Sequence, residues 1–306
     1  MVERIEETVP AAFDGDRVDR FVAAVTGESR ARVKALITDG HVTRNGQTVP
    51  SASLRIDLDD RIVVELQPLA DERPQPDPGV RFSVVHEDAD VIVIDKPAGV
   101  VVHPGAGQRV GTLVNGLLSR YPEMAEVGER HRPGIVHRLD RGTSGVMMVA
   151  RTSEAYDVLV GQLAAHEPER VYQALVWGQP ERDSGTIDAP IGRSTRHPTR
   201  MTVTPDGRPA VTHYSVLVRH TVPVTTALLD CRLETGRTHQ IRVHLRAIGH
   251  PIVGDRDYDG GRPGLDPGRP FLHARLLRFT HPRSGVVLEA EAPLPADLAE
   301  LLAGCR

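Results

Sequence analysis

The chain of 306 residues has few cysteines, few aromatic residues and no long apolar run. Its two cysteines, Cys231 and Cys305, cannot build a disulfide framework or a usual zinc site, which indicates a reducing, cytoplasmic setting. Because no run of about 18 apolar residues occurs, no membrane-spanning helix is expected. The acidic opening MVERIEETVP lacks the apolar core of a signal peptide. A composition of 40% hydrophobic and 25% charged residues predicts a soluble globular protein.

Lysine is almost absent. Lys34 and Lys96 are the only two, so 35 of the 37 basic residues are arginine. A GC-rich genome explains such a bias, although arginine is also the better bidentate partner for phosphate and carboxylate groups. The net charge of −4 gives no overall signal for a nucleic-acid partner. Phosphate binding, however, requires only a local basic face.

A proline-rich stretch divides the chain. The residues PLADERPQPDPG, 68–79, contain four prolines and no periodicity, which is typical of a linker. We therefore expect a small domain over residues 1–67, a linker over 68–80 and a large domain over 81–306.

The small segment has the pattern of an α/β domain. Apolar residues at helical spacing predict a helix over 16–25, and a second helix follows with Ser29 as N-cap and Gly40 as its end. The string HVTRNGQTV then predicts two short strands joined by an Asn-Gly turn, and residues 60–66 predict a closing strand.

Basic residues gather on the second helix of this segment. Arg30 and Lys34 are four positions apart and share one helix face, whereas Arg32 lies off that face and Arg44 follows on a strand. These four residues are candidate RNA contacts. A solvated helix surface explains the same spacing.

The large segment is dominated by strands. Runs rich in β-branched residues predict strands within 90–104, 145–151, 170–178, 208–218, 225–235 and 285–293. Helices are expected at 111–119, 153–166, 238–248 and 296–303. Because strands outnumber helices and do not alternate with them, we expect an α+β fold with a mixed or antiparallel sheet.

The string GIVHRLDRGTSGVMMVA, 134–150, places polar groups just before an apolar strand. Asp140 stands at the mouth of that strand, where a rigid sheet can hold a reactive carboxylate. An aspartate before Thr143 and Ser144 can also simply cap a turn.

A second polar string is LETGRTHQIRVHL, 233–245. Arg237 lies near the expected helix start, where the helix dipole disfavours a cation. Its position therefore indicates an anionic partner, either Asp140 or a phosphate. An ordinary surface arginine is the alternative.

Two further features are candidates for function. Tyr172 lies in the strand RVYQALVWG, where a tyrosine is most often part of the core or the sheet surface. The loop GRSTRHPTRMTV carries Arg193, Arg196 and Arg200 on an expected hairpin. This basic patch can contact a phosphate backbone, although a solvated loop is equally consistent with it.

Established nucleotide and metalloprotease motifs are absent from the chain. It contains no GxxxxGK[ST], no HExxH and no GxSxG string. His239 and His244 are five positions apart on the expected helix, which does not suit a single metal ion. No catalytic metal is expected.

The quoted strings occur together with VIDKPAGVVVHPGAG and GDRDYDGG, in an order that resembles the RluA family of ribosomal large-subunit pseudouridine synthases. The string PIGRSTRHPTRMTVTPDGRPAVTHY is similar to the type that modifies several uridines in one stem-loop of large-subunit RNA. Residues 1–67 resemble the small alpha-L (S4-like) RNA-binding domain. The resemblance covers nearly the whole chain.

The resemblance implies that uridine in RNA is isomerised to pseudouridine by base flipping, without a cofactor. It implies that Asp140 is the catalytic aspartate and that Arg237 pairs with it. Tyr172 would pack on the flipped base and is a candidate for the later proton abstraction. Arg138 would handle the extruded nucleotide, and Ile241 would line the pocket.

Physical chemistry agrees with these roles. Unstacking a base costs a few kcal/mol, so an aromatic ring and an arginine are useful replacements for the lost stacking. A buried carboxylate tends to become neutral, and Arg237 beside it would keep Asp140 charged. Whether Asp140 attacks the ribose C1′, attacks the base or removes a C2′ proton is left open.

The expected partner is large-subunit ribosomal RNA or an assembling ribosomal subunit. We expect the protein to act as a monomer and to make no membrane contact. A non-catalytic RNA-binding or ribosome-assembly factor on the same fold is the alternative function. A metal-dependent hydrolase has little support.

Overall fold

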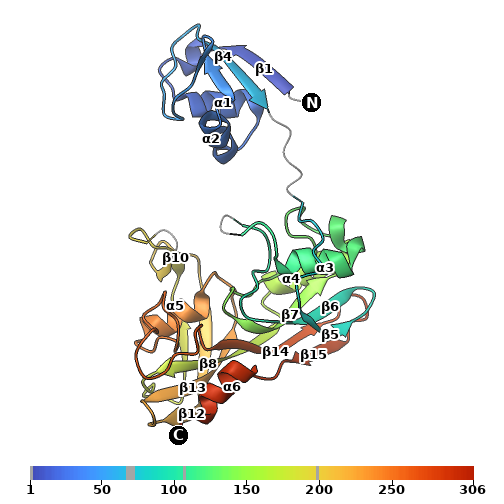
Figure 1. Cartoon of the computed structure of the whole chain (residues 1–306), viewed down its shortest axis with the longest axis vertical. Helices are drawn as coiled ribbons and strands as arrows, with labels where there is room; N and C mark the ends of the chain where they lie inside the picture. The colour runs from blue at the N-terminus through green and yellow to red at the C-terminus, as the bar shows by residue number, and fades with distance from the viewer. Residues whose placement is uncertain (1–2, 67–72, 106–107, 198–199) are drawn as a thin grey trace. The chain divides into compact units, whose positions relative to one another are not determined.

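The computed structural model describes residues 3–66, 73–105, 108–197 and 200–306, and divides into two compact units (Figure 1). The first unit is Met1–Glu72 and the second is Arg73–Arg306. Each unit has its own apolar core. Among the described residues, no helix combines the length and the apolar character needed to span a membrane.

The smaller unit is an antiparallel sheet with two helices. Its strands lie in the order β1-β4-β2-β3. Ser29 Oγ accepts a hydrogen bond from the backbone N–H of Arg32, so the expected N-cap is confirmed. Asn45 and Gly46 both have positive φ, which confirms the expected turn between two strands. The elements are β1 (Glu3–Thr8), η1 (Ala11–Phe13), α1 (Val18–Thr26), α2 (Arg30–Thr38), β2 (Val42–Arg44), β3 (Gln47–Thr48) and β4 (Arg61–Leu66).

The larger unit is built on a nine-stranded mixed sheet, which confirms the expected α+β class. Its strand order is β5-β6-β7-β14-β8-β13-β12-β9, and β15 pairs with β14. A separate two-stranded hairpin, β10-β11, stands apart from this sheet. The strands are β5 (Ser83–Glu87), β6 (Val91–Lys96), β7 (Ser144–Ala150), β8 (Glu169–Trp177), β9 (Ser184–Asp188), β10 (Ile191–Arg193), β11 (Met201–Val203), β12 (Val211–His220), β13 (Thr226–Leu233), β14 (Leu272–Thr280) and β15 (Val287–Glu291).

The helices of the larger unit lie where the apolar spacing placed them. Helix α4 packs against β7. The strand expected within 90–104 ends early, because Pro97 cannot continue the ladder and Gly99 has a φ of +89°. The helices are α3 (Leu113–Arg120), η2 (Pro122–Glu126), α4 (Ser153–Ala164), α5 (Gln240–Ala247) and α6 (Ala296–Ala303).

Part of the stretch expected to be a linker belongs to the larger unit. Asn115 of α3 accepts a hydrogen bond from the Asp77 N–H at its backbone oxygen, and its side chain donates to the Gln75 carbonyl at 2.7 Å. Gln75 and Asp77 therefore lie against α3. The remainder of the expected linker, 67–72, falls outside the described residues.

Strand β14 joins the two halves of the large sheet. It pairs in parallel with β7 through His273–Ser144 and Ala274–Gly145, and antiparallel with β8. Gly145 has a φ of +116°, and a Cβ atom there would lie 2.1 Å from the Ala274 carbonyl oxygen. Only glycine permits this approach, so β7 is fixed in the middle of the sheet.

A charged cluster ties the β5–β6 turn to the end of β14. Burial alone would raise the pKa of Asp88. Hydrogen bonds from His86 and from the backbone N–H groups of Asp90 and Val91, with the charge of His281, overcome that effect and lower it to about 2. The carboxylate form of Asp88 therefore stabilises the native state.

Changing Asp88 to asparagine tests this contribution. The folded pKa lies below the unfolded value of about 3.9, so the stabilisation is present above about pH 4 and is lost as pH falls through about 2. Because the side chain is 32% exposed, screening reduces the expected loss at pH 7 to about 1 kcal/mol. Urea unfolding of both proteins at several pH values measures it. A difference that stays constant down to about pH 2 would contradict the assignment.

Candidate active site

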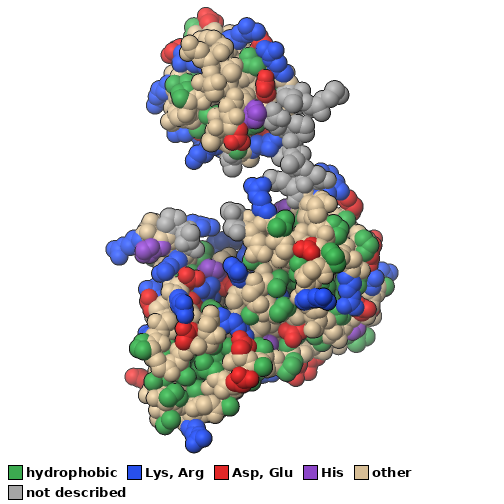
Figure 2. Space-filling model, viewed as in Figure 1, with side chains coloured by type: hydrophobic (Ala, Val, Ile, Leu, Met, Phe, Trp, Pro, Cys, Tyr) green, Lys and Arg blue, Asp and Glu red, His purple; other side chains and the backbone are tan. Residues whose placement is uncertain are grey.

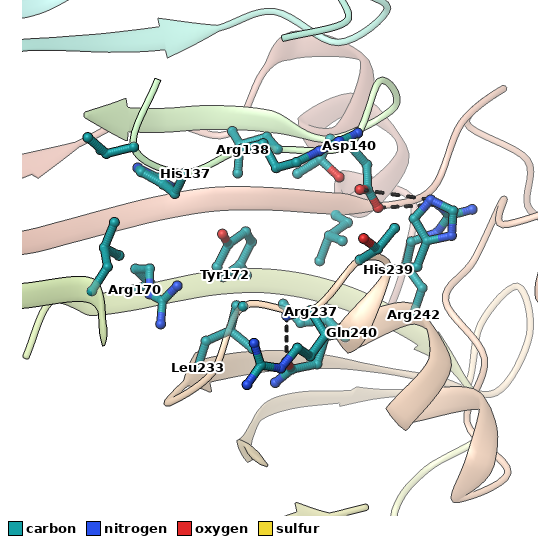
Figure 3. A pocket seen from close by; sticks show the side chains of 18 of the residues that line it. His137, Arg138, Asp140, Arg170, Tyr172, Leu233, Arg237, His239, Gln240 and Arg242 are labelled. Atoms are coloured by element: carbon teal, nitrogen blue, oxygen red, sulfur yellow. Dashed lines mark hydrogen bonds and ion pairs between the residues drawn. The ribbon is translucent and has the colours of Figure 1, made fainter. Parts of the chain in front are cut away.

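A cavity of about 540 Å³ opens in the larger unit (Figure 3). Most of its lining comes from the residues before β7, the end of α4 with the start of β8, and the turn that leads into α5. These are the segments that carry the HRLD string, Tyr172 and the TGRTHQIR string. The fold therefore brings together residues that are about 100 positions apart in the sequence.

Asp140 lies at the edge of this cavity. Its backbone carbonyl accepts a hydrogen bond from the Thr143 N–H, and the neighbouring Leu139 is buried. Among the described residues, the carboxylate itself hydrogen-bonds only to Arg242, with Nη1 donating to Oδ2 at 3.3 Å. The side chain does not cap the turn, so the alternative that Asp140 is only a turn cap is not supported.

Arg242 is held rigidly from the opposite side. Its Nε and Nη2 donate to the two carboxylate oxygens of Asp255 at 2.7 and 2.8 Å, and Nη2 also reaches Asp257. Burial would lower the pKa of Arg242, but Asp255, Asp140 and Asp257 raise it instead. The guanidinium is therefore a permanent, oriented positive charge beside Asp140.

The prediction that Arg237 pairs with Asp140 is wrong. Arg237 Nε donates to the Pro209 carbonyl at 3.0 Å, away from Asp140. Burial and the charge of Arg208 lower its pKa. The partner of Asp140 is Arg242, five positions later in the same string. Arg242 stands between the apolar residues Ile241 and Val243 of the expected helix, and this placement of a cation in an apolar run was the available signal in the sequence.

Gln240 explains why Arg237 points elsewhere. Its Oε1 accepts from the Thr235 hydroxyl at 2.7 Å and from the Arg237 N–H at 2.9 Å. Its Nε2 donates to the Val211 carbonyl and the Thr212 hydroxyl, each at 3.0 Å. These four hydrogen bonds of the Gln240 amide hold the turn before α5 in place. The turn in this form directs Arg237 toward the chain before β12.

His239 is a second group that sequence reasoning missed. It adopts a left-handed conformation with φ +57°, and its Nε2 lies 3.9 Å from Asp140 Oδ1. Burial lowers the pKa of His239, with a smaller opposing effect from Asp140. A neutral imidazole therefore faces the carboxylate next to Arg242 (Figure 3).

Tyr172 and Ile241 form apolar surface inside the cavity. Both side chains are almost fully buried, and both line the cavity wall. Burial raises the pKa of Tyr172 to about 12, so the phenol stays protonated at neutral pH. Its hydroxyl has no hydrogen-bond partner in the part of the chain that the structure describes. The ring is placed to contact a bound group.

Arg138 lies at the exposed rim of the cavity. Its Nη1 donates to His103 Nε2 at 3.2 Å, and His103 Nδ1 in turn donates to the Pro104 carbonyl at 3.0 Å. This contact joins the HRLD string to the VVHP string. The hydrogen bond to His103 therefore orients the Arg138 guanidinium at the rim, and the Arg138 side chain remains exposed.

Two buried cations were not singled out from the sequence. Arg170 is 6% exposed and lines the cavity, and Nη2 donates to the Glu234 carbonyl at 2.8 Å. Within the described ranges no carboxylate lies at ion-pair distance from it. Lys96 is fully buried, donates to the carbonyls of Pro97 and Val100, and has its pKa lowered to about 7 by burial. The scarcity of lysine could have drawn attention to Lys96.

The expected RNA contacts differ in their surroundings. Arg193 and Arg196 are exposed on the β10–β11 hairpin, and Arg200 is half-buried. In the smaller unit, Arg30 and Lys34 are exposed on α2, as their spacing predicted. Figure 2 shows basic side chains interspersed with acidic ones on the visible face of each unit.

Some of the expected RNA contacts are engaged within the protein. Arg44 bonds to Asp57 and Asp60 and to the Arg55 carbonyl, so its guanidinium serves the fold of the smaller unit. Arg32 pairs with Glu28 at 3.3 Å. Arg30 also lies 3.9 Å from Asp19, but its side chain stays exposed, as does that of Lys34, so this pair on α2 is the better candidate surface.

Comparison with known families covers both units. Residues 90–247 match the family of RNA pseudouridylate synthases, and residues 16–62 match the S4 domain. Among solved structures, human RNA pseudouridylate synthase domain containing 1 is 27% identical with a TM-score of 0.58, over 76% of this chain and 90% of that chain.

Full-length relatives share these assignments. An RNA pseudouridine synthase of Chloroflexus aurantiacus, described as uncharacterized, is 50% identical over 96% of this chain and 91% of that protein. The ribosomal large subunit pseudouridine synthase D of Nitrosomonas europaea is 43% identical over 99% of this chain and 88% of that protein. Matching motifs, fold and full-length similarity together show that the chain belongs to the RNA pseudouridine synthase family and carries an S4 domain.

Proposed function

We propose that this enzyme isomerises uridines of large-subunit ribosomal RNA, with Asp140 as the reacting carboxylate. The observation that carries the proposal is a single carboxylate at a cavity edge, fixed by a buried arginine and facing an apolar wall. Relatives named ribosomal large subunit pseudouridine synthase D support the choice of RNA. A cytoplasmic location follows from that substrate.

The cavity suits one nucleoside taken out of its stack. A base in a stem-loop must be extruded before its glycosidic bond can be reached. Tyr172 and Ile241 offer apolar surface to the extruded base, and Arg138 at the rim can occupy the space that the base leaves. These contacts offset the few kcal/mol that unstacking costs.

The reaction needs no external reagent. The bond between ribose C1′ and base N1 breaks, a bond between C1′ and C5 forms, C5 loses its proton and N1 gains one. Asp140 serves as nucleophile or base only while it is ionised, and Arg242 balances its charge. With a pKa of about 12, Tyr172 is better suited to packing on the base than to abstracting the C5 proton.

We assign the basic side chains that do not contact Asp140 to binding of the RNA backbone. Arg170 is a buried guanidinium without a carboxylate partner in the described part of the chain, and a phosphate of the bound strand would supply the missing negative charge. Arg237, which also lines the cavity, can bind a phosphate in the same way. The hairpin residues Arg193, Arg196 and Arg200 and the α2 pair Arg30 and Lys34 extend the contact.

Replacement of Asp140 tests the proposed chemistry. An RNA transcript of the large-subunit rRNA carrying tritium at uridine C5 should release tritium with the wild type and none with Asp140→Asn. Asp183→Asn, at an exposed turn carboxylate paired with Arg219, is the matched control and should keep the wild-type rate. Equal release by Asp140→Asn would remove Asp140 from the chemistry. Release from other RNAs but not from this transcript would reject only the substrate.

Two arginine variants test which guanidinium serves Asp140. Arg242→Met leaves Asp255 buried and unpaired, so the free energy of unfolding should fall by about 3 kcal/mol. Its turnover should fall by a factor on the order of a hundred, corresponding to the loss of a charge-assisted contact.

Arg237→Met is the comparison and loses one hydrogen bond, worth about 1 kcal/mol. It should weaken RNA binding with a smaller effect on turnover. Urea unfolding and single-turnover tritium release measure both quantities. A greater loss of turnover in Arg237→Met than in Arg242→Met would reverse the assignment.

The exposed basic pair of α2 generates a binding prediction. The double variant Arg30→Gln, Lys34→Gln should bind the rRNA fragment more weakly and leave turnover at saturating RNA unchanged. The slope of log affinity against log salt should become less steep by about 1 to 2, because each phosphate contact contributes about 0.7 to 0.9. Arg4→Gln, exposed on β1, is the control. An unchanged salt slope would exclude this helix face from the RNA contact.

A further inference from the structure

Tyr258 is a buried tyrosine whose hydroxyl lies between two separate elements. It belongs to the loop between α5 and β14, is 1% exposed and is absent from the cavity lining. Its Oη lies 2.9 Å from the Met201 backbone nitrogen and 2.7 Å from His239 Nδ1. One hydroxyl therefore contacts both the β10–β11 hairpin and the turn that precedes α5.

The donors and acceptors that are present favour one direction for each of these hydrogen bonds. A backbone N–H can only donate, so Met201 donates to the Tyr258 oxygen. The hydroxyl hydrogen has no other acceptor among the described residues, and donation to His239 Nδ1 is the arrangement that uses it. A neutral imidazole that accepts at Nδ1 carries its hydrogen on Nε2. In His239, Nε2 is the atom that lies 3.9 Å from Asp140 Oδ1.

The ring of Tyr258 also contacts both groups that face Asp140. Its centroid lies 5.6 Å from the His239 ring in an edge-to-face arrangement, and the Arg242 guanidinium carbon lies 4.8 Å from it. His239 holds a left-handed backbone conformation that most residues avoid. A bond at Nδ1 is the contact that sets the orientation of this ring.

We propose that Tyr258 is a positioning residue, whose hydroxyl fixes the tautomer and orientation of His239 so that Nε2–H faces Asp140 opposite Arg242. The inference rests on the proposed role of Asp140. The carboxylate is then oriented by a fixed cation at Oδ2 and by a neutral donor at Oδ1. His239 closes toward Oδ1 when substrate fills the cavity, since hydrogen bonds in active sites commonly shorten in the reacting complex.

The arrangement also connects the hairpin with Asp140. Met201 begins β11, and its side chain packs on the apolar cluster that contains Tyr258 and Val243. The hairpin that carries the exposed arginines is thus joined through one hydroxyl to His239. Loss of that hydroxyl therefore affects the orientation of His239 while the ring packing on Arg242 remains.

Tyr258→Phe, His239→Asn and the double variant form the test, with single-turnover tritium release from the rRNA transcript as readout. Asparagine tolerates the left-handed backbone of position 239 and cannot reach Asp140 as imidazole does. Each single variant should react about tenfold more slowly, with an unchanged RNA concentration for half-maximal rate. The double variant should be no slower than His239→Asn. Tyr214→Phe, outside the cavity, is the control for loss of a tyrosine hydroxyl and should react at the wild-type rate.

Imidazole nitrogen NMR gives a second readout that a structural role would not change. The wild type should show His239 protonated at Nε2 only, and Tyr258→Phe should show a mixture of tautomers. A wild-type rate for either single variant would overturn the proposal, as would rate losses that multiply in the double variant. Should Tyr258→Phe fail to fold, the wild-type tautomer of His239 and the rate of His239→Asn decide together, and a wild-type ring protonated at Nδ1 would overturn the proposal. Asp140→Asn in the same assay distinguishes failure of this inference from failure of the proposed function, because activity without this carboxylate would reject the proposed function itself.

Discussion

The ion pair between Arg242 and Asp255 is the interaction on which the site depends. Asp255 is completely buried and accepts two hydrogen bonds from the guanidinium, so the arginine cannot turn away without stranding a charge inside the protein. Its remaining Nη1 is thereby aimed at Asp140. A surface arginine would lose this orientation to side-chain motion and solvent, and would hold the carboxylate less specifically.

The sheet supplies the second constraint. Asp140 precedes β7, and β7 is pinned to β14 where Gly145 lets the two backbones approach. Tyr172 projects from β8, which pairs with the other edge of β14. One central strand therefore sets the separation between the carboxylate and the aromatic ring. The chemistry rests on backbone hydrogen bonds in a rigid sheet, which suits a reaction that requires precise placement.

The cavity contains more positive charge than its own carboxylates neutralise. Arg170 lines the cavity and is buried with only a carbonyl as partner among the described residues. Such a group destabilises an isolated protein. It is consistent with a site completed by a polyanion, whose phosphates supply the absent negative charge. The acidic whole-chain charge does not conflict with this, since binding depends on the local field.

Much of this protein was determined by local sequence. The strands at β7, β8 and β13, the cap at Ser29 and the turn at Asn45 follow from β-branched runs and side chains that bond to their own backbone. Strand β1, with its polar sequence ERIEET, and strand β14, which is interrupted by arginines, were missed because pairing with distant strands stabilises them.

The motifs likewise identified the residues that meet at the cavity, but not how they meet. Arg237 and Arg242 belong to one string, and composition cannot tell which of them faces Asp140. Gln240 turns the first toward Pro209, and Asp255 holds the second in place. The sequence by itself determined which chemical groups are present and on which elements they lie. Only the tertiary structure decided the ion pair and the contact of Tyr258 with His239, because both depend on side chains brought together from separate segments of the chain.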